Sequence, residues 1–365
     1  MRLLVCNSGT GFSTEDVHDG INGALTRAGH MTIPYDLHSR LEKEAEYLNF
    51  MAERRRAVDP DFPPPHMNDI VYRAGSGMLE RALRHDVDWV LIVSGGYTHP
   101  SWLELLTKAG IRLGIVLTES PYLDELQATC MARYAEVCWT NERTSVPYLR
   151  GACPQTYYLP ASFDATRHTP ESRTGHPDYD CLPHHDVVFV GTGFKERIEL
   201  LEAVDWGDID FGLYGLWSKV PETSPLYPHI RRDVCEGPID NWRAAELYRR
   251  AKVGLNLYRT DSGQVAESLN PRAYELAACG VPYVSAYRAE TRHVFGSIIP
   301  TFNDATELEC LLRGLLMDDG GRRMMRDDLP ACVAGHSFDA RVAQMLADME
   351  WSMKQEGAGC DQARA

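Results

Sequence analysis

The chain has 365 residues, of which 44% are hydrophobic and 24% are charged, a composition typical of a globular protein with two domains. Its 37 basic and 52 acidic side chains give a formal charge of −15, which argues against a protein that wraps nucleic acid through phosphate contacts. No apolar run approaches the roughly 18 residues that span a bilayer, and the apolar opening stops at Asn7 before a signal peptide could form. We therefore expect a cytoplasmic protein without a membrane span.

Cysteine usage supports a reducing compartment. The ten cysteines are scattered without a C-x-x-C pair or a disulfide-rich spacing, so we expect reduced thiols that pack as small hydrophobic side chains. The pair His184 and His185 has no acidic or cysteine partner at a metal-ligand spacing. The sequence therefore predicts no metal site.

Short apolar runs recur along the chain, and each is followed by polar, helix-like sequence. Continuous apolar strands that alternate with helices are typical of parallel sheets covered on both faces. The expected strands, in chain order, are 3–6, 89–93, 113–117, 137–140, 187–190, 211–214, 253–257 and 282–285. The clearest helices are 19–28, 242–251 and 305–317, the last with Asp304 as its cap.

The strand–helix alternation lapses between Pro160 and Pro183, where the chain is rich in proline, glycine and polar residues. It resumes at Asp186, so the chain is predicted to form two doubly wound α/β units joined by a linker. We place the N-terminal domain at 1–170, the linker at 171–185 and the C-terminal domain at 186–336. Ligands of such sheets bind beyond the carboxyl ends of the strands, so we expect a cleft between the two domains.

The most informative segment runs from residue 253 to residue 284 and reads as a strand, a polar loop, a short helix and a strand. Asn270 is a good N-cap for the helix and Pro271 suits its first position. The free amides at this helix terminus favour a phosphate or another anion. Glu267 and Glu275, separated by seven residues, flank the terminus, and their carboxylates suit sugar hydroxyls.

The segment Glu-Ser-Leu-Asn-Pro-Arg-Ala-Tyr-Glu-Leu-Ala-Ala-Cys-Gly-Val-Pro resembles the Glu-x(7)-Glu motif of retaining GT-B glycosyltransferases, and most closely the branch typified by the spore maturation protein CgeB. The resemblance implies two Rossmann-like domains that face each other across a cleft. It assigns Glu267 to the donor sugar and Glu275 to the ribose of the nucleotide. The family's commoner Gly-aromatic-Gly is replaced here by Ser268, Leu269 and Asn270, which with Arg272 we assign to the donor site.

The resemblance extends to both sides of the motif. It implies a glycine turn at Gly191 and Gly193 and diphosphate-binding cations at Lys195 and Arg197, which replace a metal in neutralising the leaving group. Tyr214 falls on the family's next strand, and Pro238 and Ile239 on the loop that meets the nucleobase. A closing segment implies a helix over 337–355 that crosses back to the N-terminal domain.

In the N-terminal half the resemblance is looser. The Gly-rich loop 7–14 fails as a dinucleotide fingerprint, and its alternatives are a tight turn or a loop that meets donor phosphates through Gly11 and Ser13. His99 and Glu119 follow predicted strands and are assigned to the acceptor side. A histidine in that position is more often a structural cap, and this alternative stays open.

The predicted function is transfer of a sugar from a nucleotide diphosphate donor, with a UDP-sugar favoured, to an acceptor hydroxyl with retention, without a metal or cofactor. One alternative is an epimerase-like enzyme on the same fold, which would need more acid and base groups near the anomeric carbon. Another is a non-catalytic nucleotide-sugar-binding or assembly protein, although Glu267 and the cations are present. The acceptor can be a glycan, a protein or a small molecule; the acidic charge disfavours a modified phage DNA base.

Overall fold

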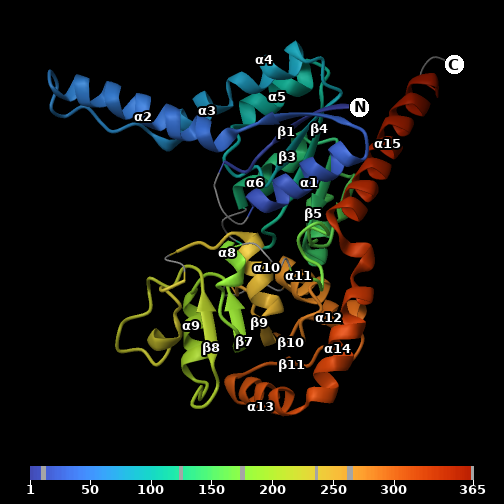
Figure 1. Cartoon of the computed structure of the whole chain (residues 1–365). Helices are drawn as coiled ribbons and strands as arrows, with labels where there is room; N and C mark the ends of the chain where they lie inside the picture. Colours follow the sequence, from blue (N-terminus) through green and yellow to red (C-terminus); the bar gives the residue numbers. More distant parts are fainter. Residues whose placement is uncertain (10–13, 123–125, 173–176, 235–236, 261–265, 363–365) are drawn as a thin grey trace. The chain divides into compact units, whose positions relative to one another are not determined.

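The computed structural model describes residues 1–9, 14–122, 126–172, 177–234, 237–260 and 266–362. The chain divides into an N-terminal unit, Met1–Pro160 with Asp339–Ala365, and a C-terminal unit, Ala161–Phe338 (Figure 1). Each unit contains one sheet whose strand pairs are all parallel. The predicted fold class, two Rossmann-like α/β units, is confirmed.

The N-terminal unit has a six-stranded sheet in the order β2-β1-β3-β4-β5-β6. Its strand order reverses between β1 and β3, which is where such sheets bind ligands. The strands are β1 (Arg2–Cys6), β2 (Met31–Tyr35), β3 (Trp89–Val93), β4 (Arg112–Leu117), β5 (Val137–Thr140) and β6 (Thr156–Tyr158). The helices are α1 (Glu15–Arg27), α2 (Leu37–Arg56), α3 (Met67–Gly75), α4 (Gly77–Arg84), α5 (Pro100–Lys108), α6 (Leu126–Met131), α7 (Val146–Leu149) and α15 (Phe338–Gln362).

Helix α15 returns the end of the chain to the N-terminal unit. The Trp139 indole nitrogen donates to Asp348 Oδ2 at 2.9 Å, and Gln344 Nε2 donates to the Tyr158 carbonyl at 3.0 Å. Met345 and Met349 are fully buried on the same helix. These contacts hold α15 against β5 and β6.

The C-terminal unit has a five-stranded sheet in the order β11-β10-β9-β7-β8. Val187 and Phe189 enter one hydrophobic cluster while Val188 and Val190 enter another, so β7 is buried on both faces and reads as a continuous apolar run. The strands are β7 (His185–Val190), β8 (Phe211–Tyr214), β9 (Ala251–Asn256), β10 (Tyr283–Ala286) and β11 (Thr301–Phe302). The helices are α8 (Pro177–Asp180), α9 (Lys195–Glu202), α10 (Asn241–Arg249), α11 (Pro271–Ala278), α12 (Ala289–Phe295), α13 (Ala305–Met317) and α14 (Asp319–Cys332).

The boundary between the units lies ten residues before the predicted one. Residues 161–170 belong to the C-terminal unit, where the Phe338 amide donates to the Phe163 carbonyl at 3.0 Å. The Arg167 guanidinium lies 5.2 Å from the centre of the Trp242 ring, and His168 is buried. The segment looks like a linker because it is polar and proline-rich, but it is anchored by a few well-placed side chains.

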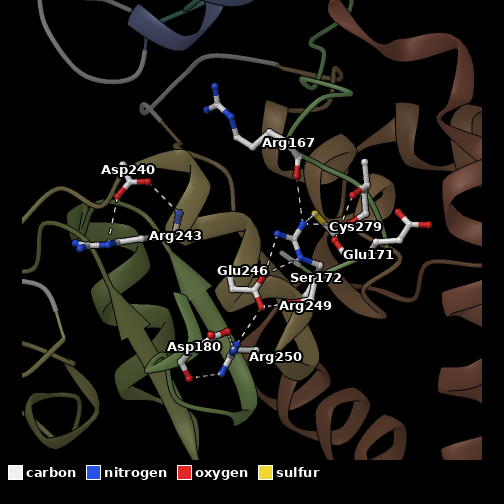
Figure 2. Close-up of polar contacts among 11 residues, drawn as sticks. Arg167, Glu171, Ser172, Asp180, Asp240, Arg243, Glu246, Arg249, Arg250 and Cys279 are labelled. Carbon is white, nitrogen blue, oxygen red and sulfur yellow. Dashed lines mark hydrogen bonds and ion pairs between the residues drawn. The ribbon is translucent and has the colours of Figure 1, made fainter. Parts of the chain in front are cut away.

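A buried ionic cluster fastens this segment to α10 (Figure 2). Glu246 accepts from Arg249 and Arg250 at 3.0 Å each and from the Ser172 hydroxyl. Arg249 also donates to the carbonyls of Arg167 and Thr169, at 3.2 and 3.1 Å. Two arginines and one carboxylate therefore add polar anchors to the hydrophobic anchor that the buried Phe163 provides. Across the described part of the chain, no helix is long and apolar enough to cross a membrane.

Candidate functional site

The carboxyl end of β7 leads into a tightly packed glycine turn. A Cβ at Gly191 would lie 2.6 Å from the Arg272 guanidinium, and one at Gly193 would lie 2.5 Å from the Trp217 ring. Gly215, after the neighbouring strand β8, has φ +106°, and a Cβ there would lie 2.3 Å from the Gly191 carbonyl oxygen. Gly193 and Gly215 are required because an aromatic ring and a backbone carbonyl approach them too closely for any larger residue, whereas the nearest atom to Gly191 is the end of the Arg272 side chain.

The two predicted diphosphate-binding cations at the start of α9, Lys195 and Arg197, differ in their exposure to solvent. The Lys195 side chain is 82% exposed and lies 3.7 Å from Glu199, whereas Arg197 is only 8% exposed. Arg197 donates to the carbonyls of Thr192, Leu257 and Tyr258, at 3.0, 3.2 and 3.4 Å. Residues two apart in a helix point in different directions, so one ligand cannot be met equally by both side chains. Arg197 joins the glycine turn to the loop after β9.

Helix α11 begins as predicted and is tied to the same loop. Asn270 Oδ1 accepts from the Ala273 amide at 3.2 Å, the N-cap bond, while its Nδ2 donates to the Leu257 carbonyl at 3.1 Å. Arg272 donates to the carbonyls of Leu257 and Val190, with its guanidinium 4.5 Å from the centre of the Phe189 ring. The Leu257 carbonyl thus receives donors from Asn270, Arg272 and Arg197, and this convergence links β7, β9 and α11.

The loop that carries Glu267 is held by Arg288 and Glu290, two residues at the start of α12. The buried Glu290 carboxylate accepts from the Leu269 amide at 2.8 Å, and the Glu290 amide donates to the Glu267 carbonyl at 3.1 Å. Arg288 donates to the Ala266 carbonyl and lies 4.6 Å from the centre of the Tyr258 ring. Sequence reasoning missed Arg288 and Glu290, because no local pattern marks residues that support a loop twenty positions earlier.

The four motif residues differ in exposure. The Glu267 side chain is exposed, Ser268 and Leu269 are buried, and Asn270 is partly buried. Of these four side chains, that of Glu267 is the most accessible to a ligand, whereas Leu269 packs into the core.

Glu275 lies one turn into α11 and is partly buried. Burial raises the pKa of the neighbouring Tyr248 hydroxyl, and the charge of Glu275 adds to this effect. Burial also raises the pKa of Cys279, at the end of α11, to about 12, which keeps the thiol protonated. Cys279 is therefore a packing residue and no nucleophile.

The remaining donor-side predictions fall in varied environments. The Tyr214 hydroxyl is buried and lies 2.7 Å from His185 Nε2, whose Nδ1 lies 3.1 Å from Asp210 Oδ2. Pro238 is exposed and Ile239 is buried in the core. The Tyr214 hydroxyl is thus engaged within the unit. Gly11 and Ser13 lie outside the described residues.

The acceptor-side predictions lie in the N-terminal unit. His99 caps α5, since its Nδ1 accepts from the Ser101 amide at 3.2 Å, and its ring forms a T-shaped contact with the Tyr72 ring, 5.1 Å between centres. Glu119 follows β4, is partly buried, and its carbonyl accepts from the Tyr122 amide at 2.9 Å. The cap role of His99 favours the structural alternative. Among the described residues, no group of three or more His, Cys, Asp and Glu side chains is arranged to hold a metal ion.

Comparison with known proteins identifies a family model and a set of similar folds. Residues 196–347 match the family model described as "Glycosyl transferase-like". No curated protein matches the chain. The 152 matched residues contain α9 from its second residue onward, the motif loop and α11, the elements that the convergent contacts at Leu257 connect.

Three solved structures are similar over nearly their whole length. Sucrose-phosphate synthase from Thermosynechococcus elongatus is 13% identical with a TM-score of 0.60, covering 98% of this chain and 100% of its own. Anabaena HepE, solved with UDP, is 13% identical with a TM-score of 0.60, at coverages of 96% and 99%. A Listeria monocytogenes protein described as a UDP-N-acetylglucosamine 2-epimerase is 12% identical with a TM-score of 0.60, at 97% of both chains. The chain therefore has the GT-B fold, and a glycosyl transferase-like segment covers most of its C-terminal unit and the start of α15.

Proposed function

We propose that this protein transfers a glycosyl group from a nucleoside diphosphate sugar, with a UDP-sugar preferred, to the hydroxyl of an acceptor, with retention and without a metal ion. The observation that carries the proposal is the connection of three candidate donor elements within one unit. The glycine turn, the Glu267 loop and the start of α11 are joined through Arg197, Arg272 and Asn270 at the Leu257 carbonyl. A turn, a helix N-terminus and a carboxylate together suit a diphosphate sugar.

Each group has a distinct role in this proposal. The α11 amides and Lys195 neutralise the diphosphate as its bond to the anomeric carbon breaks, which stabilises the developing charge. Glu267 accepts hydrogen bonds from the sugar hydroxyls and Glu275 from the ribose. The acceptor hydroxyl attacks the face from which the diphosphate leaves, and its proton passes to the departing phosphate. HepE, one of the similar structures, was solved with UDP and with UDP-glucose, which supports a UDP-sugar donor.

The acceptor is proposed to be a glycan, a protein side chain or a small molecule. The chain's charge of −15 disfavours a modified DNA base, because approach to the phosphate backbone would be repulsive. The sequence of residues 267–282 supports placement of this chain in the CgeB-like branch of the family.

The first experiment is a calorimetric and thermal-shift screen of the full chain with UDP-, GDP-, ADP-, TDP- and CMP-sugars. A ligand bound only by the native state raises the melting temperature, so we expect a selective response to UDP-sugars that is lost in Glu275→Ala. Glu267→Ala should retain UDP binding and abolish sugar transfer. EDTA should leave transfer intact; loss of activity that manganese restores would refute the metal-free mechanism.

A second candidate is epimerisation of a nucleotide sugar, which the similarity to the Listeria monocytogenes protein favours. Incubation of the binding donor without acceptor separates the two. If NMR shows a change of sugar configuration while the nucleotide is still attached, the enzyme is an epimerase. Release of UDP only when an acceptor is added would establish transfer.

A further inference from the structure

Glu290 is a buried carboxylate that contacts the Glu267 loop from a different element. It is the second residue of α12 and is only 4% exposed. Its Oε2 accepts from the Leu269 amide at 2.8 Å, and its own amide donates to the Glu267 carbonyl at 3.1 Å. Burial of a carboxylate is costly unless hydrogen bonds replace its water. This one residue therefore holds the backbone on both sides of Ser268.

Arg288, the N-cap residue of α12, supports the same loop through its side chain. Its guanidinium donates to the Ala266 carbonyl and, at 3.4 Å, to the Arg259 carbonyl. It also lies 4.6 Å from the centre of the buried Tyr258 ring, which fixes its own position. A planar guanidinium with several donors suits two carbonyls at once. The start of α12 thus contacts the loop at Ala266, Glu267 and Leu269.

These contacts fix the backbone of Glu267 and leave its side chain exposed. The Glu267 carbonyl and the Leu269 amide bind the same residue, so a change at Glu290 displaces the loop on both sides of Ser268. A group that binds a ligand must be held within about 0.5 Å of its productive position by the residues that support it. The two hydrogen bonds of Glu290 therefore determine where the Glu267 carboxylate lies.

Stabilisation of α12 alone is the alternative role for Glu290. An acidic side chain in the first turn of a helix is favoured by the partial positive charge of the helix terminus. That role requires a negative charge, which an exposed glutamate supplies equally well. It does not account for a carboxylate buried against the Leu269 amide.

We propose that Glu290 is a positioning residue for sugar recognition, which sets the Glu267 carboxylate against the sugar of the donor through the Glu267 carbonyl and the Leu269 amide. The inference rests on the proposed function, because it requires a nucleoside diphosphate sugar as the ligand. It adds that selection of the sugar, in contrast to binding of the nucleotide, depends on a residue of α12 that acts through the loop.

Calorimetric titration of the full chain with UDP, UDP-glucose, UDP-galactose and UDP-N-acetylglucosamine tests the proposal. The quantity compared is the sugar increment, defined as the affinity for the best-bound UDP-sugar divided by the affinity for UDP. Glu290→Ala and Glu267→Ala should each lower the increment about tenfold, the equivalent of one lost hydrogen bond to a charged group, and leave the affinity for UDP unchanged. The double variant should lose no more than Glu267→Ala, because Glu290 acts through Glu267.

Two conservative variants distinguish positioning from stabilisation of α12. Glu290→Gln keeps the length of the side chain and an oxygen that accepts from the Leu269 amide, so it should retain most of the sugar increment. Glu290→Asp keeps the charge but is shorter by one methylene, so it should lose the increment. A role in stabilising the helix terminus by charge predicts the opposite order. Both variants are milder than Glu290→Ala and test the proposal even if the alanine variant does not fold.

Two controls separate positioning from a general loss of stability. Glu246→Ala removes another buried carboxylate of the same unit, and should lower the melting temperature without changing the sugar increment. Glu307→Ala removes a matched bond at the start of α13, where Glu307 accepts from the Asn303 amide at 2.8 Å, and should also leave the increment unchanged. All titrations are made below the lowest melting temperature among the variants.

Failure of the inference and failure of the proposed function give different results. A wild-type chain that binds neither UDP nor any UDP-sugar refutes the proposed function and the inference with it. An increment that Glu267→Ala lowers but Glu290→Ala leaves intact refutes the inference alone. An increment that Glu267→Ala does not alter shows that its carboxylate meets no sugar, and an equal loss of UDP and UDP-sugar affinity in Glu290→Ala shows a general disturbance of the site; either result overturns the inference.

Discussion

Separate replacement of Lys195 and Arg197 should show that Arg197 stabilises the fold and that Lys195 contributes to donor binding. Arg197 is 8% exposed and donates to three carbonyls, from Thr192, Leu257 and Tyr258. Hydrogen bonds that involve a charged group contribute about 1.5–3 kcal/mol each. Burial of the Arg197 charge on folding costs desolvation energy, which offsets part of the sum of the three bonds. We expect Arg197→Ala to lower the free energy of unfolding by about 3 kcal/mol. In a domain of this size that is a fall of about 6–12 °C in melting temperature.

Lys195 is expected to behave in the opposite way. Its side chain is 82% exposed, so Lys195→Ala should leave the melting temperature unchanged. Loss of its charge near the diphosphate should weaken UDP binding about tenfold, equivalent to 1.4 kcal/mol. Arg197→Lys keeps the charge but lacks the planar fork, and should recover only part of the stability.

The two assays are thermal unfolding of each variant and calorimetric titration with UDP, well below the lowest melting temperature. If Arg197→Ala melts like the wild type while its UDP affinity falls as in Lys195→Ala, Arg197 is a direct phosphate ligand and the reasoning is refuted. Absence of UDP binding to the wild-type chain would instead contradict the proposed donor.

Other regions of the C-terminal unit yield further predictions. Glu246→Ala leaves the buried Arg249 charge without its carboxylate and should destabilise the protein by about 3–5 kcal/mol in urea denaturation, whereas Glu309→Ala, which removes a surface ion pair, should have little effect. Burial lowers the pKa of His168 from 6.5 to about 3. As the pH falls below 6.5, His168 therefore becomes protonated in the unfolded state but stays neutral in the folded state. Stability should then fall by up to about 1.4 kcal/mol per pH unit, and His168→Gln should flatten the curve of unfolding free energy against pH. Gly215→Ala combines φ +106° with a 2.3 Å approach to the Gly191 carbonyl, and should lower both the melting temperature and UDP affinity; unchanged values would show that the turn is adaptable.

Strands buried on both faces were predictable from sequence because they need apolar side chains at successive positions. All eight predicted strands coincide with strands of the structure, whereas β2, β6 and β11 were missed. β2 contains Pro34 and lies at the edge of its sheet, and β6 and β11 have three and two residues. Edge strands tolerate proline and need few apolar residues, so they leave a weak pattern.

Local chemistry likewise determined the start of α11 and of α13. Asn270 and Asp304 cap these helices as predicted, because an N-cap bond spans only three residues of chain. The same holds for the order of the motif: Glu267, the helix terminus and Glu275 follow from the sequence alone.

Contacts between distant segments were decided by the tertiary structure. The sequence offered Lys195 and Arg197 as two equivalent cations, but only the folding of residues 257–258 against the glycine turn gives Arg197 three carbonyl acceptors and leaves Lys195 exposed. Arg288 and Glu290 support the Glu267 loop for the same reason. A sequence pattern records the requirements of one helix or strand, whereas hydrogen-bond partners tens of residues apart are selected only when the sheet has brought their strands together.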